Sequence, residues 1–140
     1  MRTTRLALLL AAVGCVFLFA HSGLSQDGSL TLATDAVSPQ RFIAVHGRRA
    51  LLDGYASQSL EAWVYPFQIF RGYRVAFRFE GATTPINGPD VLTRIEYEPN
   101  AVTRIYLGPD FKVREKLFVP LNQPGAILCY SIQSEKPVEI

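Results

Sequence analysis

The feature that most constrains this chain is an alternation of apolar and polar side chains that recurs from Arg41 onward. Between Tyr73 and Glu80, aromatic and aliphatic residues take the odd positions, and the even positions include Arg74 and Arg78. Successive side chains of a strand point to opposite faces, so this period of two predicts a half-buried antiparallel strand. Rings would lie on one face of that strand and charges on the other.

Turn-forming residues separate the alternating runs. They fall at 98–100, 108–110 and 122–125, where Pro, Asn and Gly favour tight turns. Runs spaced about ten residues apart, with no segment of helical apolar period, predict an all-β fold, either an antiparallel meander or a β-sandwich. The expected strands are 41–46, 50–55, 60–65, 73–80, 91–97, 103–107, 111–119 and 126–132. The residues expected to share one strand face are Val91, Thr93, Ile95 and Tyr97 in one run, and Phe111, Val113, Glu115, Leu117 and Val119 in another.

The N-terminus has the pattern of a secretory signal. Arg2 and Arg5 precede an uncharged apolar run at 6–20, and small residues follow at the two cleavage positions, Ser22 and Ser25. The run is shorter than the roughly 20 residues that a membrane-spanning helix needs. We therefore expect export to the periplasm or the cell exterior, without a stable membrane anchor.

Two other interpretations of the N-terminus stay open. Residues 6–26 carry no charge, which is also compatible with an uncleaved anchor. Cys15 is a weaker candidate for lipidation, because the apolar run continues past it where a lipoprotein normally has a polar tether. The expected organisation is a signal peptide at 1–25, a small and polar flexible lead-in at 26–40, and one β-domain at 41–140.

Charge and length narrow the possible functions. A signal peptide at 1–25 holds two of the 14 basic residues and none of the 12 acidic ones, so the mature chain has no formal net charge. Arg and Lys are dispersed rather than gathered in a stripe, which argues against a nucleic-acid partner. The remaining chain of about 115 residues suffices for one domain with its own core.

No set of residues in the sequence forms a catalytic constellation. Glu96 and Glu98 are two apart on an expected strand and would project from one face. A glycosidase instead places two carboxyl groups on opposite sides of a sugar in a cleft. We expect a solvated charged face, on which Arg94 and Arg104 from neighbouring strands neutralise the two carboxylates.

The other reactive side chains also lack partners in the sequence. His46 has no Ser or Cys at a defined spacing, so we expect a hydrogen-bonded loop or strand-end histidine. Cys129 is the only cysteine outside the signal peptide, which excludes an intrachain disulfide and a cysteine metal site in the mature chain. Its neighbours Leu128 and Tyr130 favour a buried or sheet-face thiol over a nucleophile. The sequence thus predicts no catalytic residue, no metal and no cofactor.

The densest group of aromatic residues occurs at 60–73, LEAWVYPFQIFRGY, which contains the only Trp. Trp63 and Tyr65 fall on one face of the expected strand, and Glu61 on the same face indicates that it is partly wet. An aromatic ring with adjacent polar groups can stack against the C–H face of a pyranose. Rings also fill cores, so both interpretations stay open, with Trp63 and Tyr65 as the best ligand-facing pair.

Three stretches resemble a known family: HGRRALLDGY, LEAWVYPFQIFRGYRVAFR and GPDFKVREKLFVPLNQPGAILCY. They are similar to the N-terminal β-sandwich region of bacterial glycogen-debranching-type proteins, which are six-hairpin glycosidases with an (α/α)6 catalytic barrel. The resemblance covers Arg41–Ile140, and its most specific parts are Glu61–Phe67 and Val113–Pro120. It implies a supersandwich-like β-domain that precedes the barrel, packs against it and helps to shape the mouth of the sugar site. The catalytic acids of that family belong to the barrel, so none carries over to this chain.

The resemblance implies a non-catalytic accessory domain of an exported α-glucan-active hydrolase, in which Trp63, Tyr65 and Arg71 contact an oligo- or polysaccharide. Its partner would be a C-terminal (α/α)6 domain that is missing from this chain. The alternative is a free-standing exported β-sandwich that acts as a binding or interaction module; an independent hydrolase is a third reading. Because the alternation restarts at Val138 and stops at Ile140, we expect that the β-domain is incomplete there, with an unprotected strand edge.

Overall fold

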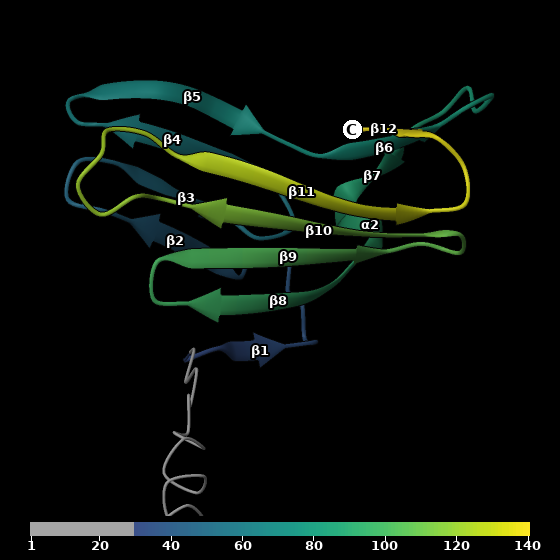
Figure 1. Ribbon diagram of the computed structural model, residues 1–140, viewed down its shortest axis with the longest axis horizontal. Coiled ribbons are helices and arrows are strands. Elements are labelled where there is room, and N and C mark those ends of the chain that lie inside the picture. Colours follow the sequence, from purple (N-terminus) through teal and green to yellow (C-terminus); the bar gives the residue numbers. More distant parts are fainter. Residues whose placement is uncertain (1–29) are drawn as a thin grey trace, which may run out of the picture.

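Two runs of consecutive hairpins form most of this structure, a computed structural model that describes residues 30–140 (Figure 1). All pairings are antiparallel, and the two main sheets pack face to face as a β-sandwich. The first run forms a four-stranded sheet in chain order: β2 (Phe42–His46), β3 (Leu51–Tyr55), β4 (Leu60–Val64) and β5 (Phe67–Tyr73). The second forms the larger part of a five-stranded sheet: β8 (Leu92–Glu98), β9 (Ala101–Leu107), β10 (Phe111–Phe118) and β11 (Ile127–Ser134).

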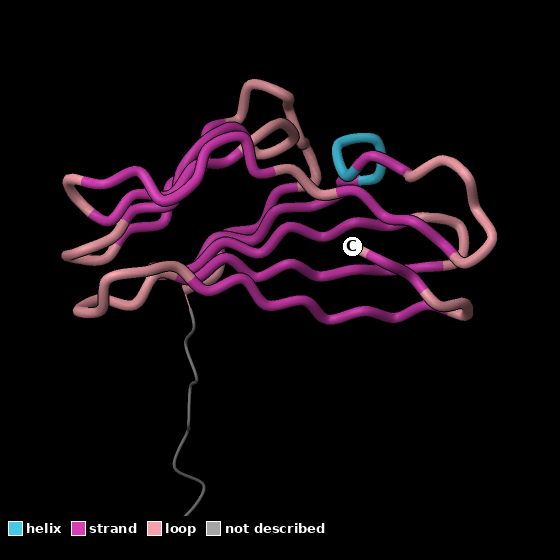
Figure 2. Tube along the Cα trace, turned by 90° about the horizontal axis from the view of Figure 1, so that it is seen from above, coloured by secondary structure: helices cyan, strands magenta, loops and turns pink. Residues whose placement is uncertain are grey.

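Short elements complete the sandwich. β1 (Leu32–Thr34) pairs with β8 and forms the edge of the five-stranded sheet opposite β11. A three-stranded group consists of β12 (Val138–Glu139), β6 (Ala76–Phe79) and β7 (Ile86–Asn87), followed by the four-residue helix α2 (Gly88–Val91). Figure 2 shows that the four-stranded sheet lies over one end of the five-stranded sheet and that α2 lies over the other end.

This arrangement produces two apolar cores. Under the four-stranded sheet, Ile43, Leu52 and Leu60 pack against Val102 and Leu117, and all five are nearly or fully buried. At the other end a smaller core forms around aromatic rings. The ring of Phe77 lies 5.1 Å from that of Tyr106 and 5.2 Å from that of Phe111, between centroids. Both cores use the inner face of β9 and β10, so these central strands hold the two ends of the sandwich together.

A row of polar residues crosses the interior between the two cores. The strand register places Arg104, Glu115 and Tyr130 side by side across β9 to β11. Arg104 and Glu115 are buried, with 2% and 0% of their surface exposed. The expectation that Arg104 lies on a solvated face is wrong, because Arg104 faces inward and pairs with Glu115.

The all-β antiparallel sandwich expected from the sequence is confirmed, and most strands lie where the alternation predicted them. Three strands were not predicted: β1, which lies within the lead-in expected at 26–40, β5 and the two-residue β7. A register shift between Leu92 and Arg94 changes the phase of β8, so Leu92 is buried and Thr93 is exposed. The expectation that Thr93 shares a face with Ile95 is therefore wrong. The expected strand at 73–80 is divided, because Tyr73 ends β5 and β6 belongs to a different sheet.

The predicted signal peptide at 1–25, with Cys15, lies outside the described residues. Within residues 30–140, no helix has the length and apolar character needed to cross a membrane.

Candidate functional site

The outer face of the four-stranded sheet gathers aromatic and polar side chains. Its residues alternate along the strands with the buried Ile43, Leu52, Leu60 and Ala62, and so point away from the core. Cross-strand pairing places them in rows, with Trp63 between Leu51 and Gln68 and with Asp53 opposite Glu61. We define the outer face by Phe42, Asp53, Tyr55, Glu61, Trp63 and Gln68.

Glu61 fixes the position of the indole on this face. The Trp63 indole Nε1–H donates to Oε1 of Glu61 at 2.9 Å, and the Gln68 side-chain amide donates to Oε2 at 2.9 Å. Both carboxylate oxygens are thus occupied, and Trp63 is held while part of its ring stays accessible. Glu61 and Trp63 share a partly exposed strand face, as the sequence predicted.

A pocket of about 470 Å³ opens beside the indole. We call it the hairpin pocket, because much of its wall is the β2–β3 hairpin; its lining includes His46, Arg48, Arg49, Leu51, Trp63 and Tyr65. Tyr65 follows β4 directly and is 90% exposed. Trp63 and Tyr65, the aromatic pair singled out in the sequence, therefore meet at one pocket, within the size range of small-ligand sites.

The β2–β3 hairpin is anchored on the β10–β11 connection. The Gly47 amide donates to the Ala50 carbonyl at 3.0 Å and closes the turn. The Arg48 amide donates to the Leu121 carbonyl at 2.7 Å, across the two sheets. A Cβ on Gly47 would lie only 2.2 Å from the Pro120 carbonyl oxygen, so the close approach requires glycine. The two arginines of the pocket are thus carried by a turn with a fixed position.

Arg71, the third residue proposed from the sequence, does not line the hairpin pocket. It lines a second pocket of about 340 Å³ on the same sheet, with Asp53, Tyr55 and Glu61. Burial, together with the nearby Glu61 charge, raises the pKa of Asp53, although His46 acts in the opposite direction. The outer face therefore has two hollows of different character, one lined by basic side chains without a carboxylate and one lined by two carboxylates and an arginine.

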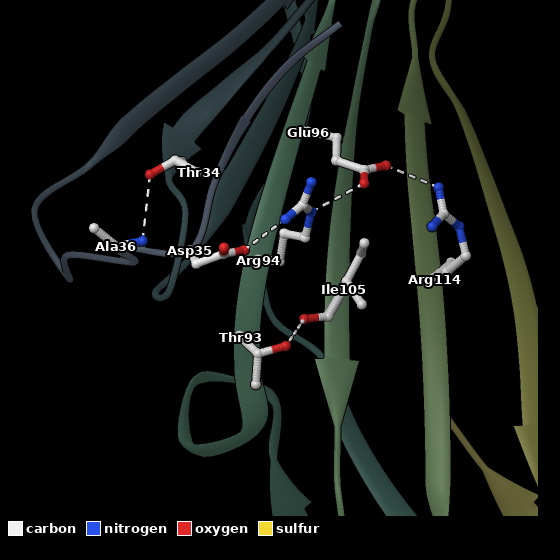
Figure 3. A network of polar contacts seen from close by, with 8 residues as sticks. All are labelled: Thr34, Asp35, Ala36, Thr93, Arg94, Glu96, Ile105 and Arg114. Atoms are coloured by element: carbon white, nitrogen blue, oxygen red, sulfur yellow. Dashed lines mark hydrogen bonds and ion pairs between the residues drawn. The ribbon is translucent and has the colours of Figure 1, made fainter.

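The two carboxylates considered as a glycosidase pair, Glu96 and Glu98, belong to an ion-pair ladder on the outside of the five-stranded sheet. Figure 3 shows the part of this ladder around Glu96. Glu96 accepts from Arg94 Nε at 3.1 Å and from Arg114 Nη2 at 2.9 Å, and Glu98 accepts from Lys116 Nζ at 2.6 Å. Partial burial opposes ionisation of Glu96, but the hydrogen bonds from the two arginines outweigh it and lower its pKa. A catalytic acid needs a raised pKa, so Glu96 is unsuited to that role.

The third carboxylate of interest, Glu115, is sealed inside the sandwich. Its Oε2 accepts from Arg104 Nε at 2.6 Å and from the Tyr106 hydroxyl at 2.8 Å. Its Oε1 accepts from the Tyr130 hydroxyl at 2.9 Å and from Tyr73, and the hydroxyls of Tyr73 and Tyr130 also contact each other. Burial opposes ionisation, but Arg104 and these donors lower the pKa of Glu115.

The three tyrosines around Glu115 are hydrogen-bond donors. Burial, with the added effect of the Glu115 charge, raises the pKa of Tyr130 to about 12 and also raises those of Tyr73 and Tyr106. Because Tyr73 comes from β5, the network links the edges of both sheets. This network was not predicted from the sequence. The one signal for it was that Glu115 takes a position on the apolar face of its strand, where a buried carboxylate needs a cationic partner.

The remaining reactive residues are dispersed. His46 ends β2, as expected for a strand-end histidine, and borders the hairpin pocket. Cys129 is an exposed free thiol on β11, which agrees with the sheet-face alternative and not with the buried one. In the part of the chain from residue 30 onward, no three His, Cys, Asp or Glu side chains lie close enough together to hold a metal ion.

Comparison with known proteins returned no matching family model, no similar curated protein and no similar solved structure.

Proposed function

We propose that this chain is the non-catalytic N-terminal β-domain of an exported carbohydrate-active protein, a glycoside hydrolase of the glycogen-debranching type, and that its outer face binds sugar. The observation that carries the proposal is the arrangement at the hairpin pocket. The Trp63 indole is fixed by Glu61, and the Tyr65 ring beside it is almost fully exposed.

Such an arrangement fits a sugar better than it fits a core. A ring that fills a core is buried, whereas Tyr65 is 90% exposed and Trp63 is partly so. Stacking on a pyranose covers apolar ring surface while the sugar hydroxyls remain free to bond polar neighbours. Polar neighbours are present, because Gln68, Asp53 and Glu61 lie on the same face.

The proposed role is non-catalytic because each carboxylate examined as an acid has another function. Glu96 and Glu98 hold the cations of the outer ladder, and Glu115 stabilises the interior. The segment Glu61–Phe67, one of the two most specific parts of the family resemblance, forms most of β4 and the start of β5. That segment supplies Trp63 and Tyr65 to the pocket.

The test uses the fluorescence of the chain's single Trp, which reports directly on this face. Titration with maltohexaose, other neutral oligosaccharides and acidic oligosaccharides should give a saturable change with at least one of them. Tyr65→Ala should weaken that binding by about 5- to 150-fold, the loss of one stacking platform. Tyr130→Phe, an aromatic change on the other sheet, is the control that should leave the affinity unchanged. The absence of any saturable response across the panel would refute the sugar-binding role.

The free-standing binding module shares the same face and the same titration. The two alternatives differ only in whether the β-domain is joined to a catalytic barrel. The gene sequence after codon 140 decides between them.

A further inference from the structure

The lining of the hairpin pocket is basic as well as aromatic. Its lining contains three basic side chains, His46, Arg48 and Arg49, and no carboxylate. The nearest acidic residue on the Trp63 strand, Glu61, already accepts hydrogen bonds from Trp63 and Gln68. The pocket therefore combines two stacking rings with a local excess of positive charge.

The two guanidinium groups are available to a ligand. Arg49 is exposed and its side chain has no hydrogen-bond or ion-pair partner among residues 30–140. Arg48 makes only a long contact of 3.4 Å, from Nη1 to the Asn122 side-chain oxygen. By contrast, Arg94, Arg104 and Arg114 all pair with carboxylates. Arginine binds a carboxylate with two parallel hydrogen bonds, which a neutral hydroxyl cannot match.

From this combination we infer that the hairpin pocket binds an acidic sugar, with the pyranose ring on Trp63 and Tyr65 and its carboxylate on Arg48 and Arg49. The inference rests on the proposed sugar-binding function and names the class of sugar. It differs from the neutral α-glucan that the sequence resemblance implies. A nucleic acid fits the face less well, because Asp53 and Glu61 lie on the same sheet face and would repel further phosphates.

The experiment compares two ligands of equal length, an α-1,4-linked galacturonate hexamer and its carboxyl-reduced counterpart. Calorimetric titration of the full chain should show that the acidic hexamer binds about 10- to 100-fold more tightly, the effect expected for charge-assisted hydrogen bonds. The double variant Arg48→Gln/Arg49→Gln should remove this difference, so that the acidic hexamer binds no more tightly than the neutral one. Arg71→Gln, which removes an exposed arginine from the second pocket of the same sheet, is the matched control and should preserve the difference.

Each outcome separates the inference from the proposed function. Equal affinity for the two hexamers would overturn the acidic-sugar assignment and leave the sugar-binding role intact. Binding of neither hexamer would overturn the acidic-sugar assignment, and only the absence of a response across the whole oligosaccharide panel would also refute the sugar-binding role. Hexaglutamate, a polyanion without a sugar ring, should bind at least about tenfold more weakly than the galacturonate hexamer, because it gains no stacking. Equal affinity for hexaglutamate would show a general anion site and overturn the inference.

Discussion

At the scale of single residues, Glu115 has no exposed surface and accepts hydrogen bonds from Arg104 and three tyrosines. Glu115→Leu would leave the Arg104 guanidinium buried without a counter-ion. We expect a loss of about 3–5 kcal/mol in the free energy of unfolding, measured by urea denaturation. Arg104→Met combined with Glu115→Leu should lose much less, because no uncompensated charge remains. Equal losses in the single and double variants would contradict this account.

The pH dependence of stability should test the ion pairs of Glu115 and Glu96. Glu115 and Glu96 both have a pKa lowered from the ordinary value of 4.5, because the hydrogen bonds and charges of their arginine partners outweigh the opposing effect of burial. The unfolded chain therefore takes up protons first as pH falls. Their contribution to stability is complete above about pH 4.5 and is lost as pH falls through the folded pKa values. Denaturation between about pH 3 and pH 7 should show this decline, and Glu96→Gln should make it shallower. If the free energy of unfolding falls as steeply with pH in Glu96→Gln as in the wild type, the ion-pair ladder does not contribute to the pH dependence of stability.

At the scale of elements, alternation located most strands because their inner faces are apolar. It did not locate β5, because Pro66 and the register shifts between β4 and β5 disturb the period of two within 60–73. β1 has only three residues and gives no period. In β9, Val102, Arg104 and Tyr106 face inward, whereas Ile105 belongs to the opposite face and is also buried. Hydropathy alone could therefore not identify which face of β9 points into the sandwich.

The candidate site was predictable only in part, because some of its residues come from segments that are distant in sequence. Trp63, Tyr65 and Glu61 lie close together in sequence, so strand geometry alone brought them together. Arg48 and Arg49 come from a different hairpin and reach the pocket through the pairing of β3 with β4. The separation of Arg71 from Tyr65 depends on the bulged pairing of β4 with β5, which the sequence did not indicate.

The anchored β2–β3 hairpin gives a prediction at this scale. Gly47→Ala places a Cβ against the Pro120 backbone, which cannot move aside as a flexible side chain would. We expect a loss of about 1–3 kcal/mol in the free energy of unfolding and a weaker sugar response, because the turn that carries Arg48 and Arg49 is displaced. Arg49→Ala, an exposed change in the same turn, should cost less than about 0.5 kcal/mol of stability. A Gly47→Ala variant as stable as the wild type would show that the turn tolerates a shift.

At the scale of the whole molecule, the edges of the two main sheets differ in how well they are protected. β1 is three residues long, β2 is five, and β5 carries Arg71 and an irregular pairing with β4. β11 is eight residues long and contains neither a charged residue nor a proline. Ile127 and Ile132 on it are 46% and 45% exposed. Natural sheets protect long edges with charges, bulges or prolines. β11 has neither a charge nor a proline.

This edge predicts self-association of the chain. Two copies of β11 can pair antiparallel about a twofold axis, which joins the five-stranded sheets and covers the exposed isoleucines. Sedimentation of the purified protein should therefore show a mass that increases with concentration. Ser131→Glu should keep the chain monomeric, because the carboxylates that it adds to the two facing β11 strands repel each other. Within its own sheet the new side chain lies opposite Arg114 and is tolerated there. Gln58→Glu adds the same charge in the exposed β3–β4 turn and should leave association unchanged. A wild-type chain that stays monomeric at all concentrations, or a Ser131→Glu variant that still associates, would exclude β11 as the contact.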